Sequence, residues 1–272
     1  MENIYFEEIT DRTLIIDLEN EWRKTLTFPN DDFWEAQIDA AQYWVIKQAE
    51  EMIGYVCLSH RNTLYQYYIS AQWSDKGLLI LEDFIKQKEI KKALIGTNNP
   101  ICLSLSMHFQ KSVLVDGYLF GDMVDVSIEA PKGDFRIAKS NDLERLVDFS
   151  NRVINAPKDW WTNYISNWIS REEFFLFERD GKIIGTGEAR TTPINAEVAS
   201  LGIVVCPDHR NQGIGSYLLN QAKTIAKSRN QQAICGCGRD NISSLKAIEK
   251  NGFRILHTSF LIDFEEKEVG WF

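Results

Sequence analysis

Residues 201–215 read LGIVVCPDHRNQGIG, and this segment gives the clearest indication of the fold in the chain. Its first five residues form an apolar run that is typical of a buried strand. Farther on, apolar side chains recur at helical spacing, at Ile214, Leu218, Leu219, Ala222, Ile225 and Ala226. A strand, a glycine-containing turn and a helix are therefore predicted in this order, with backbone N–H groups exposed at the positive end of the helix dipole.

The turn has the composition of a pyrophosphate site. Gly213 and Gly215 have no Cβ, so a phosphate can approach the backbone N–H groups closely. Arg210 adds a permanent positive charge with forked hydrogen-bond donors. A Rossmann fingerprint is a poorer match, because it needs G-x-G-x-x-G after the first strand and an acidic residue about 20 positions further on. The other alternative is an ordinary strand-to-helix loop, in which the glycines serve only the geometry.

A second motif follows the first. A strand is predicted over residues 233–237, and residues 241–253 then read NISSLKAIEKNGF, a helix that ends in a C-terminal cap at Gly252. In this order the two motifs resemble those of the GNAT superfamily of N-acetyltransferases, and the resemblance covers residues 134–264. It implies an α/β fold with a mixed α+β sheet, in which a twisted and mostly antiparallel sheet is flanked by helices.

A Pro/Gly break at residues 129–133 divides the chain into two predicted domains, residues 1–130 and residues 134–272. The second follows the family's order of elements, β-α-α-β-β-β-α-β-α-β. The first repeats this order faintly, with strands over residues 43–46, 52–57, 64–69 and 93–96, a helix over 77–90, a helix opened by residues 98–100 and a last hairpin at Gly117-Tyr118. We interpret it as a degenerate GNAT-like domain; a coincidence of α/β patterning is the alternative.

The turn of the first domain lacks the features of a phosphate site. Residues 71–77 read AQWSDKG, with one glycine and no arginine. Asp75 falls where a pyrophosphate would lie, and the two negative charges would repel each other. We therefore expect the first domain to bind acetyl-CoA poorly and to serve as a scaffold or as one wall of the acceptor site.

The resemblance also implies which residues of the second domain hold acetyl-CoA. The cofactor lies between the strands at residues 198–205 and 233–237, and its pantetheine arm pairs with the backbone of Ile203, Val204 and Val205. An N–H near Val204 or Val205 polarises the thioester carbonyl, as in an oxyanion hole. The other implied cofactor-binding residues are Arg210, Gln212, Gly213, Ile214, Gly215 and Ser216 around the pyrophosphate, and Asn241 and Ser244 beside the arm.

Transfer to an amine requires a group that removes a proton, because an ammonium ion has no lone pair and alkyl amines have a pKa near ~10. Glu197, at the start of the central strand, is the first candidate for this catalytic base, and Glu188 on the preceding strand is the second. Each carboxylate alone is equally compatible with a surface position. The family often has a tyrosine as proton donor to the leaving thiolate where this chain has Ile248, so water, Ser244 or Tyr217 would have to substitute.

The acceptor is expected to be a small-molecule or peptide amine. Trp160, Trp161, Tyr164 and Trp168 lie on the segment that borders the acceptor pocket in this family, where aromatic rings can bind a cation. Packing on the sheet is the commoner role of such side chains. Two rival functions stay open: a non-catalytic acyl-CoA-binding or regulatory protein of the same fold, which Ile248 favours, and transfer of a different acyl group.

Composition limits the location and the partners of the protein. No apolar run reaches the ~18–20 residues that cross a bilayer, and the N-terminus lacks the basic segment of a signal peptide. The five cysteines have no zinc-site spacing and suit a reducing cytoplasm, and no metal site is expected. The net charge of −9 falls within residues 1–133, which hold 12 Lys and Arg against 21 Asp and Glu, and this argues against nucleic-acid binding.

Overall fold

The structure, a computed structural model, describes residues 4–154, 156–192 and 194–265. The first three residues of the acidic N-terminal segment and the last seven residues of the predicted second domain lie outside this description. The chain divides into two compact units. Unit 1 comprises residues 1–118 and 257–272, and unit 2 comprises residues 119–256.

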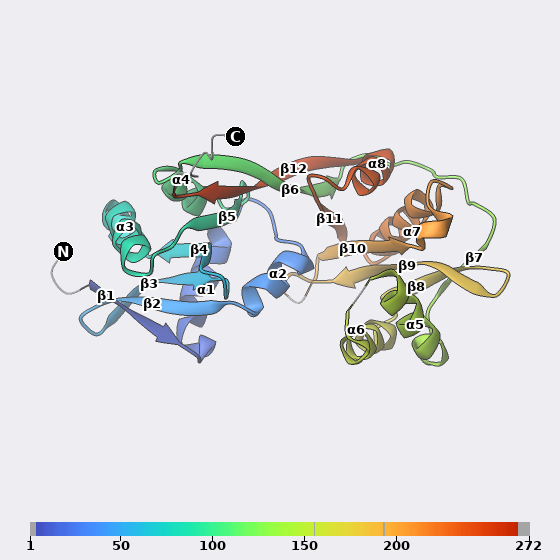
Figure 1. The fold of residues 1–272 in the computed structure, drawn as a ribbon, viewed down its shortest axis with the longest axis horizontal. Coiled ribbons are helices and arrows are strands. Elements are labelled where there is room, and N and C mark those ends of the chain that lie inside the picture. The colour runs from blue at the N-terminus through green and yellow to red at the C-terminus, as the bar shows by residue number, and fades with distance from the viewer. Residues whose placement is uncertain (1–3, 155, 193, 266–272) are drawn as a thin grey trace, which may run out of the picture. The chain divides into compact units, whose positions relative to one another are not determined.

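Unit 1 is a sheet with helices on both faces (Figure 1). Its elements along the chain are β1 (Ile4–Ile9), α1 (Ile16–Thr25), α2 (Asp32–Asp39), β2 (Gln42–Gln48), β3 (Glu51–Leu58), β4 (Thr63–Ile69), α3 (Gly77–Gln87), β5 (Lys92–Gly96), α4 (Pro100–Met107) and most of β6 (Ser112–Asp122). Strands β1 to β5 pair in sequence order, antiparallel except for the parallel pair β4–β5. One core includes Phe84 and Cys102 from α3 and α4, and a second on the other face includes Trp22 and Ile38 from α1 and α2.

Unit 2 has the same architecture (Figure 1). Its elements are β7 (Asp134–Ile137), α5 (Leu143–Val153), α6 (Lys158–Ser170), β8 (Phe174–Arg179), β9 (Lys182–Thr191), β10 (Val198–Val205), α7 (Ile214–Ser228), β11 (Gln232–Gly238), α8 (Ile242–Lys250) and the start of β12 (Phe253–Asp263). The strands are ordered β11-β10-β9-β8-β7, antiparallel except for the pair β10–β11. Helices α5 and α6 cover one face of this sheet through a core around Leu146, Ile165 and Leu176.

The predicted fold class and order of elements are confirmed in both units. The predicted hairpin at Gly117-Tyr118 is wrong, because β6 runs through both residues as one strand. Gly117 is buried inside this strand. A glycine in a strand interior often marks a close approach of a neighbouring backbone, which its sequence pattern alone does not distinguish from a turn.

The last strand departs from a simple division into two consecutive segments. Residues 259–263 of β12 pair antiparallel with β5, so this end of the chain completes the sheet of unit 1. The Pro/Gly break at residues 129–133 falls inside unit 2. The division of the sequence into residues 1–130 and 134–272 stays a prediction about the repeat and does not describe the compact units.

A buried polar network joins the first turn of α7 to the end of α8 in unit 2. Lys223 on α7 is 3% exposed, pairs with Asp122 at 2.5 Å and donates to the backbone oxygen of Asn251 at 2.9 Å. The Asn251 side chain in turn donates to the backbone oxygen of Ser216 at 2.9 Å. Gly252 follows with a φ of +83°, which confirms the predicted C-terminal cap. The network fixes the position of the helix start that follows the glycine turn.

Candidate active site

The two parallel strands of unit 2 part in the middle of the sheet. Pairing between β10 and β11 covers residues 198–200 and 232–234. Beyond Ser200 and Ile234 the described residues of both strands continue, to Val205 and Gly238, without further pairing to each other. Ile203, Val204 and Val205 keep their antiparallel partners on β9 and are half-buried. One edge of β10 is therefore available to pair with an extended ligand chain. This is the edge on which the three residues are predicted to pair with the pantetheine arm.

The glycine turn lies at the end of β10. Gly213 is the N-cap of α7, with a φ of +78° and no side chain bonded to the helix end. The first backbone bond of the helix runs from Tyr217 N to Gly213 O, so the N–H groups of Ile214, Gly215 and Ser216 have no intrahelical acceptor. A Cβ on Gly213 would meet no atom within 4 Å, so the space beside the Gly213 Cα, next to the helix start, is open. The arrangement suits an anion such as a pyrophosphate.

The turn and the parted strand lie against each other. A Cβ on Gly215 would lie 3.3 Å from Ile203 Cδ1 and 3.6 Å from Val205 Cγ2. The predicted pyrophosphate and pantetheine residues are thus brought together. Arg210 is exposed beside them, and the Gln212 side chain accepts a hydrogen bond from Arg179 Nη1 at 3.0 Å. Arg179 is therefore a second cation at this turn, which the sequence analysis missed.

The residues beside the predicted cofactor arm have mixed placements. Asn241 caps α8 by accepting from Ser244 N at 3.1 Å, so its side-chain oxygen already has a structural partner. Nearby, Cys237 is half-buried, and burial raises the pKa of its thiol. Ile248, in the place of the family's tyrosine, is 3% exposed.

Tyr217 does not join this group. Its ring makes edge contacts with Phe135 and Phe177, on β7 and β8, at centroid distances of 6.2 and 5.6 Å. These strands lie on the far side of β9 from β10 and β11. Tyr217 therefore points away from the parted strands, and the choice between water and Ser244 stays a prediction.

Glu188 lies at the point where β10 leaves β11. It faces Gly202 across the β9–β10 pair, and a Cβ on Gly202 would come within 2.5 Å of Glu188 Oε1. The carboxylate therefore lies over the backbone of β10, two residues after the last pair with β11. Its side chain is 15% exposed and accepts a hydrogen bond from Tyr164 at 2.8 Å.

Glu197 lies at the other end of β10, directly before its first residue. It is exposed, it precedes the first residue of β10, and its backbone oxygen accepts from Gln232 N at 2.8 Å, where β10 and β11 are still paired. Ile203 follows six positions later, or about 20 Å along the strand at 3.3 Å per residue. Glu188 is therefore closer to the parted strands than Glu197, and which of the two carboxylates acts as the base stays a prediction.

The aromatic residues of α6 divide into two groups. Trp161 is buried and belongs to the core under the helix, as plain packing predicts. Trp160 is 51% exposed and stacks on Tyr164, with ring centroids 4.9 Å apart and planes inclined by 14°. Tyr164 reaches Glu188 through its hydroxyl, so the Trp160–Tyr164 stack adjoins the carboxylate. It can therefore form an aromatic wall beside an amine.

Unit 1 repeats the parted strands without the phosphate turn. Parallel pairing of β4 with β5 is limited to Thr63 and Leu64 opposite Lys92 and Ala93. A 3-10 helix (Ala71–Lys76) stands where unit 2 has its glycine turn, and none of the residues 71–77 has a positive φ. The turn therefore lacks the open, left-handed glycine of unit 2, and the prediction that unit 1 binds acetyl-CoA poorly gains a structural reason.

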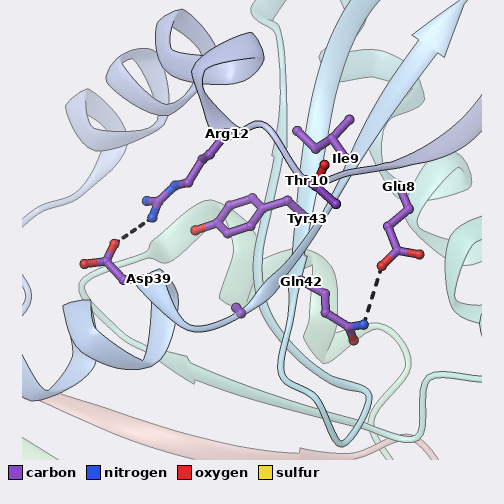
Figure 2. A pocket seen from close by; sticks show the side chains of 8 residues that line it. Glu8, Ile9, Thr10, Arg12, Asp39, Gln42 and Tyr43 are labelled. Atoms are coloured by element: carbon purple, nitrogen blue, oxygen red, sulfur yellow. Dashed lines mark hydrogen bonds and ion pairs between the residues drawn. The ribbon is translucent and has the colours of Figure 1, made fainter.

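A separate hollow of ≈ 260 Å³ lies on unit 1 beside β1 and β2 (Figure 2). Its charged groups already bond one another: Arg12 pairs with Asp39 at 2.6 Å and lies over the ring of Tyr43 at 4.7 Å. Gln42 donates to Glu8 at 3.5 Å. The hollow is not next to β4 and β5, and its satisfied charges give it no evident ligand.

Within residues 4–154, 156–192 and 194–265, none of the helices is long and apolar enough to cross a membrane. Nor do these residues bring together three or more His, Cys, Asp or Glu side chains that could hold a metal ion.

In unit 2, the unpaired edge of β10 and the glycine turn before α7 lie next to each other. This class of fold can bind an extended ligand chain and an anion side by side. Family models make the class specific: one described as acetyltransferase (GNAT) domain matches residues 12–123, and one described as acetyltransferase (GNAT) family matches residues 141–253. Together they match more than half of the chain. The chain belongs to the GNAT acetyltransferases and carries two GNAT domains in tandem, as the resemblance implied.

Individual relatives agree with this assignment. An N-acetyltransferase of Methanocaldococcus jannaschii, described as uncharacterized, is 30% identical over 125 residues, which are 42% of this chain and 50% of that protein. The chain thus covers about half the length of this curated relative. A GNAT-family acetyltransferase structure from Colwellia psychrerythraea superposes with a TM-score of 0.91 at 23% identity, over 96% of this chain and 100% of the other.

A tandem GNAT protein from the clavulanic acid biosynthesis pathway superposes with a TM-score of 0.61 at 12% identity. The match covers 98% of this chain and 100% of the other. At these identities the two solved structures show a shared fold alone.

Proposed function

We propose that the chain transfers an acetyl group from acetyl-CoA to a primary amine within a ternary complex, and that unit 2 holds the one cofactor site. One observation carries this proposal. In unit 2, β10 leaves β11 after Ser200, and the same strand ends at a left-handed glycine turn with uncapped N–H groups. In unit 1, the strands part but the turn is absent.

The residues of unit 2 fit acetyl-CoA. The N–H groups of Ile214, Gly215 and Ser216, with the Arg210 guanidinium, would hold its pyrophosphate. The open edge of β10 at residues 203–205 would hold the pantetheine arm by backbone pairing. When bound, acetyl-CoA supplies an acetyl group activated as a thioester. An N–H of Val204 or Val205 would serve as a donor to negative charge that develops at the carbonyl oxygen.

Glu188 is the base in this account. It lies over Gly202 at the start of the parted strands, and it can accept a proton from an ammonium acceptor directly or through one water. Proton removal is required because only the neutral amine has a lone pair for attack. Ser244, in the first turn of α8, would return a proton to the leaving thiolate.

The acceptor is expected to be a small-molecule or peptide amine. Trp160 and Tyr164 would hold its cationic form against an aromatic face before the proton leaves. Glu188 would then sit at the end of that face, since Tyr164 contacts both the ring of Trp160 and the carboxylate. This arrangement favours one amine group directed at one carboxylate.

A thiol-release screen tests the proposal. Purified protein, acetyl-CoA and a panel of primary alkyl amines, aryl-alkyl amines and short peptides should give CoA release together with a product heavier than the acceptor by one acetyl group. Initial rates measured against both substrates should give intersecting double-reciprocal lines, as a ternary complex requires. Parallel lines would contradict direct transfer. No acetylated product with any amine would contradict the acceptor class.

A further inference from the structure

Glu188 belongs to a bonded set of three side chains that joins α6 to β9. Tyr164 Oη lies 3.0 and 2.8 Å from the two oxygens of the Glu188 carboxylate. Arg190 Nη1 donates to the same Tyr164 oxygen at 2.8 Å, and Arg190 Nε lies 3.6 Å from Glu188 Oε1. The side chains of Arg190 and Glu188 are only 12% and 15% exposed, so solvent competes weakly for these contacts.

The chemistry of the three groups fixes the direction of each hydrogen bond. A guanidinium can only donate, so the Tyr164 oxygen accepts from Arg190. The single O–H of Tyr164 is then directed at the Glu188 carboxylate, which can only accept while it is ionised. A hydrogen bond to the charged form of a carboxyl group stabilises that form and holds its orientation. Arg190 therefore acts on Glu188 both by charge and through the tyrosine.

Uncharged neighbours also contact this set. Phe174 on β8 and Gly202 on β10 are the cross-strand partners of Glu188, and neither is ionisable. The guanidinium of Arg190 lies 5.6 Å from the ring of Trp168, which covers it from α6. Tyr164 and Arg190 are ionisable side chains that contact the carboxylate directly.

The geometry points to Tyr164 and Arg190 as positioning residues that aim the Glu188 carboxylate at the acceptor amine. This inference rests on the acetyl transfer proposed above and deepens it. The two residues act through Glu188, so their loss should affect proton removal more than acetyl-CoA binding.

The Tyr164→Phe variant tests this role, because it removes the hydroxyl and keeps the ring that stacks on Trp160. With acetyl-CoA and the best amine of the panel, kcat should fall roughly 10- to 100-fold, which is part of the roughly 10²–10⁴-fold that acid–base catalysis contributes. The KM for the amine should change little, because the ring of residue 164 can still stack on Trp160. The affinity for acetyl-CoA should not change.

Two arginine variants extend the test. Arg190→Met should lower kcat as Tyr164→Phe does, whereas Arg190→Lys keeps the charge and a donor and should restore part of the rate. The matched control is Tyr68→Phe in unit 1, which removes a tyrosine hydroxyl that donates to Glu21 at the same 2.8 Å. This control should leave kcat and KM unchanged.

The outcomes separate this inference from the function on which it rests. If wild-type protein acetylates an amine and Glu188→Gln does not, but Tyr164→Phe keeps the kcat of the wild type, then the positioning role is wrong and the proposed function stands. A rise in the KM for the amine with an unchanged kcat would also overturn it, since it would assign Tyr164 to acceptor binding alone. Absence of acetylation by the wild type would overturn both.

Discussion

Acetyl-CoA binding should be lost in the double variant Arg210→Ala/Gly213→Asp. The first change removes a guanidinium from the turn, and the second places a carboxylate in front of the uncapped N–H groups of α7. That carboxylate would occupy the donors and repel the pyrophosphate. Charge-assisted hydrogen bonds contribute about 1.5–3 kcal/mol each, so the loss of two should weaken binding by at least ~100-fold. Calorimetric titration of the purified variant with acetyl-CoA measures the change.

The chain offers a matched control for the glycine substitution. Gly181, in the β8–β9 turn, also has a positive φ, +71°, and a Cβ there would also meet no atom within 4 Å. Gly181→Asp therefore imposes a similar backbone cost in unit 2 and leaves the turn before α7 intact. It should bind acetyl-CoA like the wild type. Undiminished affinity in the double variant would show that the cofactor is held elsewhere.

Acetyl transfer should fall by about 10²–10³-fold in Glu188→Gln, within the range that general base catalysis contributes. The substitution keeps the size of the side chain and removes its ability to accept the proton of an ammonium group. The affinity for acetyl-CoA should stay constant, because Glu188 lies over Gly202 and not at the glycine turn. Steady-state rates by thiol release and a calorimetric titration separate the two effects.

Two other variants sharpen the assignment of the base. Glu197→Gln changes an exposed carboxylate at the paired end of β10 and should keep the rate within about twofold, as expected for a surface substitution. Gly202→Ala leaves Glu188 in the sequence but places a methyl group where its carboxylate lies, so it should reproduce much of the loss. A large effect of Glu197→Gln together with a small effect of Glu188→Gln would contradict the account.

Much of the fold was predictable because its signals are local. The apolar runs of β3, β4, β10 and β11, the turn at Asp180-Gly181 and the cap at Gly252 each depend on a few consecutive residues. Two features depend on distant pairing instead. Strand β6 passes through Gly117 where a turn was predicted, and the end of β12 pairs with β5, far from it in the sequence. The residues next to Gly117 and those at the end of β12 do not indicate which distant strand each of them pairs with.

The candidate site was predictable to a similar extent. The phosphate turn is contiguous in the sequence, so its residues could be assigned from one motif. The base could not, because the sequence does not show where β10 and β11 part, and this point decides between Glu188 and Glu197. Arg190 was missed although it lies two residues after Glu188 on the same strand, a spacing that places both side chains on one face.

Calorimetric titration of the wild-type protein with acetyl-CoA is the most direct test of whether unit 2 holds a single cofactor site. We expect saturable binding at one site per chain, because unit 2 has the left-handed glycine turn and unit 1 has a 3-10 helix in its place. The Arg210→Ala/Gly213→Asp variant should abolish this single site. Two sites per chain, or one site that survives in that variant, would contradict the assignment of the cofactor to unit 2, and no binding would contradict the proposed function itself.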